Sequence, residues 1–287
     1  MIARQRPPLW KTLGARQLYI TSLLTGIIGT GPAASATNLI PDLDHFRGSF
    51  GAKHVIPLWR DGEATIPNVV PGLLESLELT PEELFAYCYA LLSAPSYTTR
   101  FADELEVPGP HIPLTRDREL FSRAVGERLL WLHTYGERFA PAGMKAGEVP
   151  QGSARAEVAV PSTQEGYPQG HSYEPESLKL RVGEGIFGPV PPEVRGYSVS
   201  GLDVIGSWLD YRMLGGAGRR SSQLDRIRPA IWPAAFSEEL LRLLWVIEAT
   251  VSLGPDLDNL LKNIVVGPVY RADELPEPTP ESRLPPG

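Results

Sequence analysis

Hydrophobic positions follow a strand-like spacing in the first part of the chain and a helical spacing after about residue 72. Before that point, "QLYITSLL" and "AKHVIPLWR" are short runs of β-branched and aromatic residues that are followed by turn residues, a pattern typical of strands. After it, Thr80 to Glu83 form a capping box with Pro81 at the first helical position. The box predicts a helix that continues to about Leu92, and "SYTTRFADEL" predicts a second, short helix.

Helical spacing continues in four later stretches. Residues 116–135 predict a long helix, because their apolar positions recur at intervals of three and four. These positions are Leu120, Phe121, Ala124, Val125, Leu129 and Leu132. "SGLDVIGSWLDYRM" predicts a helix capped by Ser200 with Asp203 in its first turn. "SEELLRLLWVIEATVSL" and "PDLDNLLKNIVV" predict two more.

Residues 140–195 have a different character, with Pro, Gly, Ser and single charges between extended pieces such as "RAEVAV" and "LKLRVGEGIFGPV". The Pro-rich ending "ELPEPTPESRLPPG" predicts a disordered tail. Together the patterns predict an α+β fold with several helices in a helical subdomain. The expected parts are a β-rich part at 1–71, a helical region at 72–139, a loop-rich β segment at 140–198, a C-terminal helical region at 199–270, and the tail at 271–287.

Composition narrows the class of protein. The 287 residues allow one large domain or two ordinary ones, and 29 Pro with 28 Gly indicate many loops. Cys88 is the only cysteine and lies in the apolar run "LFAYCYALL". The chain therefore has no disulfide framework and no thiolate metal site, and we expect Cys88 to be a core residue in a reducing cytoplasm.

Charge is unevenly distributed, although the net charge of the chain is −7. Residues 1–60 carry a net +5 and residues 195–232 a net +3, whereas 61–194 carry −10 and 233–287 carry −5. We call the two positive stretches the basic islands. Such asymmetry indicates a surface that faces a polyanion on an otherwise acidic body, and random scatter is the alternative.

The uncharged stretch at 17–41 resembles a signal peptide, because basic residues precede it and it contains a small-residue site at "AASA". A membrane span would need about 20 predominantly apolar residues. Thr, Ser, Gly and Pro32 interrupt this stretch, which favours a buried strand followed by a turn. We therefore expect a soluble cytoplasmic protein.

Catalytic motifs are missing from the sequence. It contains no phosphate-loop, nucleophile-elbow or H-E-x-x-H pattern, and its five histidines are too far apart to suggest a metal cluster. His133 is expected to be a hydrogen-bonded structural residue. We predict no catalytic residue and no metal site.

Two glycine motifs could bind a cofactor or phosphate. "GTGPAAS" (29–35) follows a strand-like run and could imitate a dinucleotide or S-adenosylmethionine loop, but Pro32 and "NLIPD" leave room for at most two helical turns after it. "GGAGRRSS" follows a helix rather than a strand, which is the wrong order for a nucleotide cradle. We therefore do not expect a nucleotide to bind there.

An ordered set of stretches resembles one family. It comprises "PDLDHFRGSFGAKHVIPLWRD" (41–61), "LFAYCYALLSAPSYTTRFADELEVPGPHIPLTRDRELF" (84–121), "GERLLWLHTY", "EVRGYSVSGLDVIGSWLDYR" (193–212) and "SSQLDRIRPAIW" (221–232). The set is similar to the C-terminal specificity domain of type ISP restriction-modification enzymes and related N6-adenine methyltransferases. One departure is His111, which stands where the family usually has Arg in "P-R-I-P".

The resemblance implies a target-recognition domain that holds double-stranded DNA against an N6-adenine methyltransferase domain, often with helicase and nuclease modules upstream. The chain lacks the N-P-P-[YF] catalytic tetrapeptide. We therefore expect a non-catalytic specificity part without a cofactor of its own, and S-adenosylmethionine on the partner methyltransferase.

Recognition of DNA needs cations for phosphates and polar side chains for base edges. The basic islands supply the phosphate-binding candidates Arg47, Lys53, Arg60, Arg195, Arg212, Arg219, Arg220, Arg226 and Arg228. The base-reading candidates in loops or at helix starts are Asn38, His45, Ser49, Tyr197, Ser198 and Ser200. The alternatives are a protein–protein scaffold subunit of a defence complex and, third, a cofactor-binding enzyme that uses the "GTGPAAS" loop.

Overall fold

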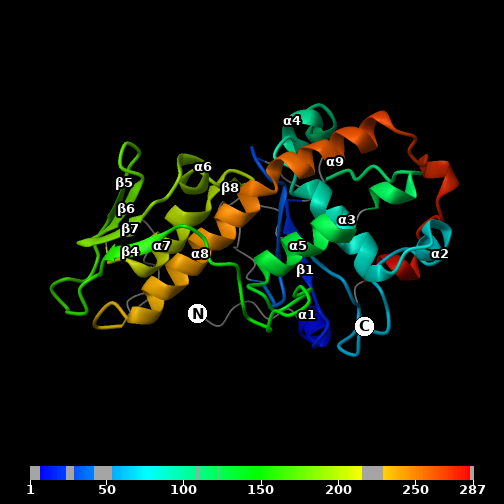
Figure 1. Cartoon of the computed structure of the whole chain (residues 1–287). Helices are drawn as coiled ribbons and strands as arrows, with labels where there is room; N and C mark the ends of the chain where they lie inside the picture. The colour runs from blue at the N-terminus through cyan, green and yellow to red at the C-terminus, as the bar shows by residue number, and fades with distance from the viewer. Residues whose placement is uncertain are drawn as a thin grey trace. The chain divides into compact units, whose positions relative to one another are not determined.

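The structure is a computed structural model, and it describes residues 7–23, 29–41, 54–107, 110–121, 123–214 and 229–284. Contacts divide the chain into two compact units. The N-terminal unit comprises Ile2–Glu148, Val199–Gly201 and Leu253–Gly287, and the central unit comprises Val149–Ser198 and Leu202–Ser252. Both units combine helices with antiparallel strands (Figure 1), so the predicted α+β class is confirmed.

A three-stranded antiparallel sheet lies in the N-terminal unit. Its strands β1 (Tyr19–Ser22), β2 (Ala34–Thr37) and β3 (His54–Pro57) are arranged in the order β2-β1-β3. All four residues of β1 are buried, because β1 is the central strand and is covered on both faces. The strands predicted in "QLYITSLL" and "AKHVIPLWR" are therefore confirmed.

Two helices of this unit pack closely on each other. The helix α3 (Pro81–Leu92) begins at the predicted capping box, in which Glu83 N donates to Thr80 Oγ1 and Thr80 N donates to the Glu83 carboxylate. The helix α5 (Arg123–His133) crosses α3 at Gly126. A Cβ atom at Gly126 would lie 2.2 Å from the carbonyl oxygen of Ala86, so only glycine permits this close approach.

The long helix predicted over 116–135 is shorter in the structure. A single 3-10 turn at Arg118–Leu120 precedes α5. Arg116 N donates to Pro268 O, and the Asp117 carboxylate accepts from Glu119 N, so the chain is extended and then capped where the helix was expected. The other helical elements of the unit are α1 (Pro7–Lys11), α2 (Leu73–Leu77), α4 (Tyr97–Arg100), α9 (Gly254–Val266) and 3-10 turns at Glu104–Glu106, Ala272–Glu274 and Glu281–Arg283.

The central unit contains a four-stranded antiparallel sheet in the order β4-β7-β6-β5. Its strands are β4 (Arg155–Val158), β5 (His171–Glu174), β6 (Lys179–Val182) and β7 (Gly185–Gly188). Leu180 pairs in register with Phe187, and both are fully buried. The helix α8 (Ala234–Ser252) runs beside β4 and contacts α6 (Pro192–Arg195) (Figure 1).

The helix α7 (Val204–Arg212) begins later than predicted. Its N-cap is Asp203, whose carboxylate accepts from Gly206 N at 2.9 Å. Ser200 lies instead in the turn between β8 (Ser198–Val199) and β9 (Leu202–Asp203), with a φ of 50°. The prediction of Ser200 as the cap was wrong because an aspartate nearer the helix satisfies the first-turn amide.

The C-terminal segment contacts the N-terminal unit in several places. Glu274 forms an ion pair with Arg116, and Pro276 lies next to Gly72. The Arg60 guanidinium donates to the carbonyl oxygens of Ser282 and Leu284. The described part of the predicted tail is therefore joined to the unit by side-chain and backbone groups.

Candidate nucleic-acid interface

Most of the candidate DNA-binding residues lie in two segments outside the described residues, 42–53 and 215–228. Those on 42–53 are His45, Arg47, Ser49 and Lys53, and those on 215–228 are Arg219, Arg220, Arg226 and Arg228. The structure does describe the residues immediately before and after each segment.

The start of segment 215–228 is fixed at the end of α7. Leu214 N donates to Pro168 O at 3.0 Å, and the Tyr167 hydroxyl donates to Arg212 O at 2.9 Å. Both bonds join the end of α7 to the loop between β4 and β5. The end of α7 is therefore held by one backbone hydrogen bond at Leu214 and one side-chain hydrogen bond at Arg212.

The chain returns from this segment at a cluster of aromatic rings. Trp232 is 1 % exposed and contacts the rings of Tyr167, Trp208 and Phe236 edge-on, at centroid distances of 5.9, 6.5 and 5.2 Å. Its indole N–H donates to Ser237 Oγ at 3.0 Å. Edge-on aromatic pairs add about 0.5–1.5 kcal/mol each beyond their buried area. Tyr167 also bonds the end of α7. The same side chain therefore contacts the chain before and after segment 215–228.

Arg212 belongs to this anchor and has internal partners. Its guanidinium carbon lies 3.8 Å from the centroid of the Trp208 ring, and Nη2 lies 3.1 Å from Glu239 Oε2. Nη1 also donates to Trp208 O at 3.2 Å. The charge is therefore offset by a carboxylate and the planar group is stacked, which indicates a structural role for this phosphate-binding candidate.

Arg195 is engaged in a similar way. Its Nη1 lies 3.0 Å from both carboxylate oxygens of Asp203, the residue that caps α7. Only 20 % of the Arg195 side chain is exposed. The pair joins α6 to the start of α7, so Arg195 also has a structural partner within the central unit.

His171, which the sequence reasoning did not select, lies beside this pair. Its Nε2 is 3.8 Å from Asp210 Oδ1. Burial and the nearby Arg195 charge lower the pKa of His171, while Asp210 and Asp203 oppose that shift. Because 39 residues separate His171 from Asp210, no local motif could have joined them; the β5 strand and α7 bring them together.

Segment 42–53 connects two ends of the N-terminal sheet. Thr37 at the end of β2 pairs with Tyr19, whereas His54 at the start of β3 pairs with Ser22. Since Tyr19 and Ser22 are the two ends of β1, the connection leads from one end of the sheet to the other. Asn38 directly follows β2 and is half-buried at the Tyr19 end.

Ser200 lies at the opposite end of this sheet, against the "GTGPAAS" loop. Ser200 N donates to Pro32 O at 2.8 Å, and Gly29 N donates to Ser200 Oγ at 3.0 Å. A Cβ atom at Gly29 would lie 2.5 Å from Ser200 O. The glycine loop is thus occupied by the chain itself, and strand β2 rather than a helix follows it, so the geometry of a dinucleotide loop is not present.

Two further base-reading candidates precede Ser200. Tyr197 and Ser198 are half-buried, and burial raises the pKa of the Tyr197 hydroxyl. Arg60, a phosphate-binding candidate in the N-terminal unit, bonds the carbonyls of Ser282 and Leu284 and lies near Asn68 Oδ1. Arg60 therefore joins the C-terminal segment to the unit.

Two histidines have identified structural contacts. His133 Nδ1 and the Tyr89 hydroxyl form a hydrogen bond, and burial lowers the pKa of His133 to about 4. The expected structural histidine is therefore confirmed. His111, at the position of the family's usual Arg, is exposed and accepts a hydrogen bond from Tyr97 through its carbonyl at 2.7 Å. This contact uses the backbone and does not depend on the side chain.

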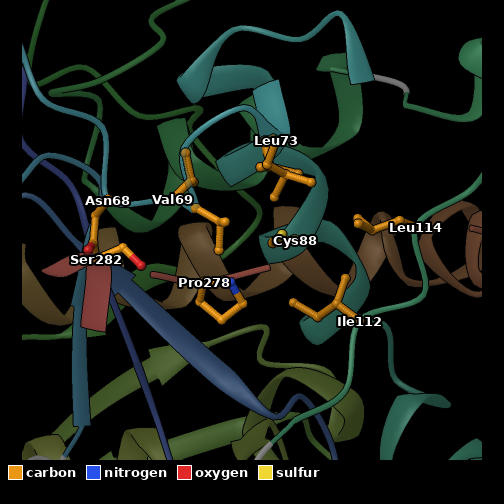
Figure 2. A pocket seen from close by; sticks show the side chains of 10 residues that line it. Asn68, Val69, Leu73, Cys88, Ile112, Leu114, Pro278 and Ser282 are labelled. Atoms are coloured by element: carbon orange, nitrogen blue, oxygen red, sulfur yellow. The ribbon is translucent and has the colours of Figure 1, made fainter. Parts of the chain in front are cut away.

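A cavity of about 390 Å³ lies in the N-terminal unit (Figure 2). Its walls are mainly apolar, with Leu84 and Cys88 from α3, Leu73 from α2, and Pro278 from the C-terminal segment. Burial raises the pKa of the Cys88 thiol to about 12, so the thiol is not a nucleophile at neutral pH. The expected core cysteine is half-buried and lines this cavity. The Cys88 thiol therefore does not support catalysis in this cavity.

In the described ranges, no group of His, Cys, Asp and Glu side chains could hold a metal ion. Within the same part of the chain, no helix has both the length and the apolar character needed to cross a membrane.

Residues 1–243 match the family described as "Type ISP C-terminal specificity domain". The chain belongs to this family, as the ordered motifs indicated. No curated protein matches the chain.

Solved structures with a similar fold are parts of larger proteins. One is described as "ATP-dependent Type ISP restriction-modification enzyme LlaBIII bound to DNA", with a TM-score of 0.59, 17% identity, and coverage of 85% of this chain and 16% of that one. The DrdV–DNA complex has a TM-score of 0.56 and 15% identity, with coverage of 88% and 25%. A nuclease-deletion mutant of the Type ISP enzyme LlaGI, in complex with a DNA substrate mimic, has a TM-score of 0.54 and 17% identity, with coverage of 85% and 17%. The chain thus spans a quarter or less of each of these proteins.

Proposed function

We propose that this chain is the DNA target-recognition module of a type ISP-like restriction-modification or phage-defence system. In this role it positions duplex DNA for N6-adenine methylation by a separate catalytic domain or chain. The observation that carries the proposal is membership of the specificity-domain family over residues 1–243. The fold shared with three proteins that are themselves described in complex with DNA supports it.

The distribution of charge agrees with this role. In the described residues, Arg195 and Arg212 are paired with carboxylates and Arg60 with carbonyl oxygens. The best candidates for phosphate contacts are therefore Arg219, Arg220, Arg226 and Arg228, with Arg47 and Lys53 on the other segment. Cations of this kind provide most of the sequence-independent part of DNA affinity.

The proposed partners are double-stranded DNA and an N6-adenine methyltransferase, with helicase or nuclease parts in the same system. S-adenosylmethionine is expected on the methyltransferase and not on this chain. We expect the complex to act in the cytoplasm, where the DNA lies.

Salt dependence of DNA binding tests the proposal. The chain and its methyltransferase polypeptide are titrated into a labelled duplex between 50 and 200 mM salt, and the logarithm of the affinity should fall linearly with the logarithm of the salt concentration. Replacing Arg219→Ala and Arg220→Ala together should reduce that slope by about 2, roughly one for each lost phosphate contact.

A matched control removes the same charge elsewhere. Arg271→Ala with Arg283→Ala also neutralises two exposed arginines, and it should leave the slope unchanged. If the pair of proteins binds DNA without any salt dependence, the proposed function is wrong.

A second candidate function, a scaffold subunit that contacts proteins and does not read DNA, is favoured by one observation. The arginines that the structure describes in the second basic island are both paired internally. In that case the Arg219→Ala, Arg220→Ala variant would keep its DNA affinity and would lose affinity for a protein partner. Mapping methylated adenines in cells that carry both proteins also separates the two functions, because only a recognition module determines the methylated site.

A further inference from the structure

The last described segment of the chain, residues 267–284, lies on the N-terminal unit, and we call it the C-terminal strap. The structure describes the whole strap, and none of its residues is buried. The helix before it, α9, buries Leu257, Leu260, Leu261 and Ile264. A segment without buried apolar side chains opens at a low cost in free energy. The strap also follows residues 1–243, the range that matches the family, so family membership assigns it no role.

Arg116 holds the first part of the strap through its side chain. Its guanidinium forms an ion pair with Glu274 and donates from Nε to Val269 O at 3.3 Å. The guanidinium carbon also lies 4.5 Å from the centroid of the Tyr270 ring. Both side chains of the ion pair are 39 % exposed. Water and competing anions therefore reach this contact, and the ion pair contributes little to stability by itself.

Arg60 holds the end of the strap. Its Nη1 donates to Ser282 O at 3.2 Å, and its Nη2 donates to Leu284 O. These acceptors are neutral carbonyl groups, whereas a guanidinium forms stronger, bidentate hydrogen bonds with a phosphate. A DNA phosphate would therefore be a better partner for Arg60 than the strap is.

The strap is acidic. Its net charge is −2, from the acidic Asp273, Glu274, Glu277 and Glu281 and the basic Arg271 and Arg283. It thus places negative charge on a surface that carries Arg60 and Arg116. Because a carboxylate and a phosphate compete for the same guanidinium donors, the closed strap lowers the number of cations that DNA can contact.

Cys88 can report whether the strap is open. Pro278 and Ser282 of the strap line the apolar cavity together with Cys88 from α3 (Figure 2). Cys88 is the only cysteine of the chain, and it is half-buried in the closed arrangement. Displacement of the strap removes part of the cavity wall, so the rate at which Cys88 is alkylated measures how often the strap is open.

We propose that the C-terminal strap is autoinhibitory: it occupies Arg60 and Arg116, and DNA binds these two cations only after displacing it. This inference rests on the proposed function, which supplies DNA as the competitor. Opening of the strap and DNA binding are then linked. A change that favours the open strap raises DNA affinity by the same factor, as long as the closed form predominates.

Alkylation of Cys88 by N-ethylmaleimide tests the strap in the absence of DNA, with the rate followed from the intact mass of the full chain. Glu274→Gln removes the carboxylate partner of Arg116 and should raise the rate about two- to fivefold, the effect of one exposed ion pair. Glu277→Gln is the matched control. It removes the same charge from another exposed position of the strap and should leave the rate unchanged.

DNA affinity is measured at low salt with the methyltransferase polypeptide present. Glu274→Gln should raise the affinity by the same factor of about two to five, whereas Glu277→Gln should not raise it. Arg116→Gln breaks the same ion pair but also removes the cation. It should accelerate alkylation at least as much as Glu274→Gln does, without raising DNA affinity above the wild-type value.

Several results would overturn the autoinhibitory strap. Faster alkylation of Glu274→Gln with unchanged DNA affinity makes the strap a structural cover only. Higher DNA affinity with unchanged alkylation is a direct effect of the lost charge, and no change in either readout means that Glu274 does not hold the strap. A gain of DNA affinity in Arg116→Gln overturns the role of that cation. Failure of the proposed function has a different signature, namely DNA binding by the wild-type pair that does not respond to salt, and it leaves the alkylation result unaffected.

Discussion

The two units differ in the side-chain groups that hold their backbone segments in place. In the N-terminal unit, buried neutral groups bond the backbone: the Gln17 side chain makes four hydrogen bonds to Thr12, Leu18 and Trp59. The hydroxyls of Tyr87 and Tyr97 donate to the carbonyls of Pro113 and His111. In the central unit, ion pairs hold both ends of α7, with Arg195 on Asp203 and Arg212 on Glu239.

This difference shows why a basic island cannot be equated with a DNA-binding surface. Arg195 and Arg212 raise the charge of the second island, yet each neutralises a carboxylate of its own unit. Their positions fix the helix from which segment 215–228 leaves. The difference also predicts that salt weakens the anchors of the central unit more than those of the N-terminal unit.

The largest effect is expected from Gln17→Leu. Gln17 is 1 % exposed, and the substitution leaves two buried N–H groups and two carbonyl groups without their partner. At about 1–3 kcal/mol for each orphaned group, we expect a loss of about 4 kcal/mol or more in the free energy of unfolding, measured by urea denaturation. The exposed Gln164→Leu should cost less than about 0.5 kcal/mol. An equal loss in both variants would contradict a stabilising role of the Gln17 side-chain hydrogen bonds.

A smaller effect is expected on acidification, through His133. The unfolded histidine takes up a proton near pH 6.5, whereas the folded pKa is about 4, so protonation favours the unfolded chain. Stability should therefore be present above pH 6.5 and should fall as the pH decreases from 6.5 to 4, by roughly 3 kcal/mol. Unfolding measured at several pH values for wild type and His133→Gln checks this, because the difference between their curves should be confined to that interval. Parallel curves would be inconsistent with a buried neutral His133.

The smallest effect is expected from Arg212→Met, which keeps an unbranched apolar side chain and removes the charge together with the guanidinium that stacks on Trp208. Because the Arg212 side chain is 27 % exposed, we expect a loss of only about 1–2 kcal/mol at low salt. A double-mutant cycle with Glu239→Gln should give a coupling energy that decreases toward 1 M salt. The DNA-binding slope should stay at the wild-type value, in contrast to the Arg219→Ala, Arg220→Ala variant. A reduced slope would place Arg212 on the DNA surface.

Local signals predicted much of the fold. The capping box at Thr80 located the start of α3, and strand-like runs located β1 and β3. The sequence missed β5, since "HSYE" has no strong strand pattern and is paired only through β6. It placed the start of α7 at Ser200, because Ser200 and Asp203 are both good caps and only the turn geometry distinguishes them.

The candidate site was predicted less completely than the fold. Sequence composition identified the two basic islands, residues 1–60 and 195–232. It could not show that Arg60, Arg195 and Arg212 have internal partners. Ser282 and Glu239 lie far along the chain from Arg60 and Arg212, and the helix motif that contains Asp203 does not indicate its pairing with Arg195. Nor could it associate His171 with Asp210.

The sequence by itself determined the α+β class, the family and the absence of catalytic motifs, because these depend on local spacing and on residue identity. Only the tertiary structure decided which arginines are neutralised and that Ser200 contacts the "GTGPAAS" loop. The physical reason is that charge pairing and burial depend on distances in space, and residues far apart in the chain set those distances.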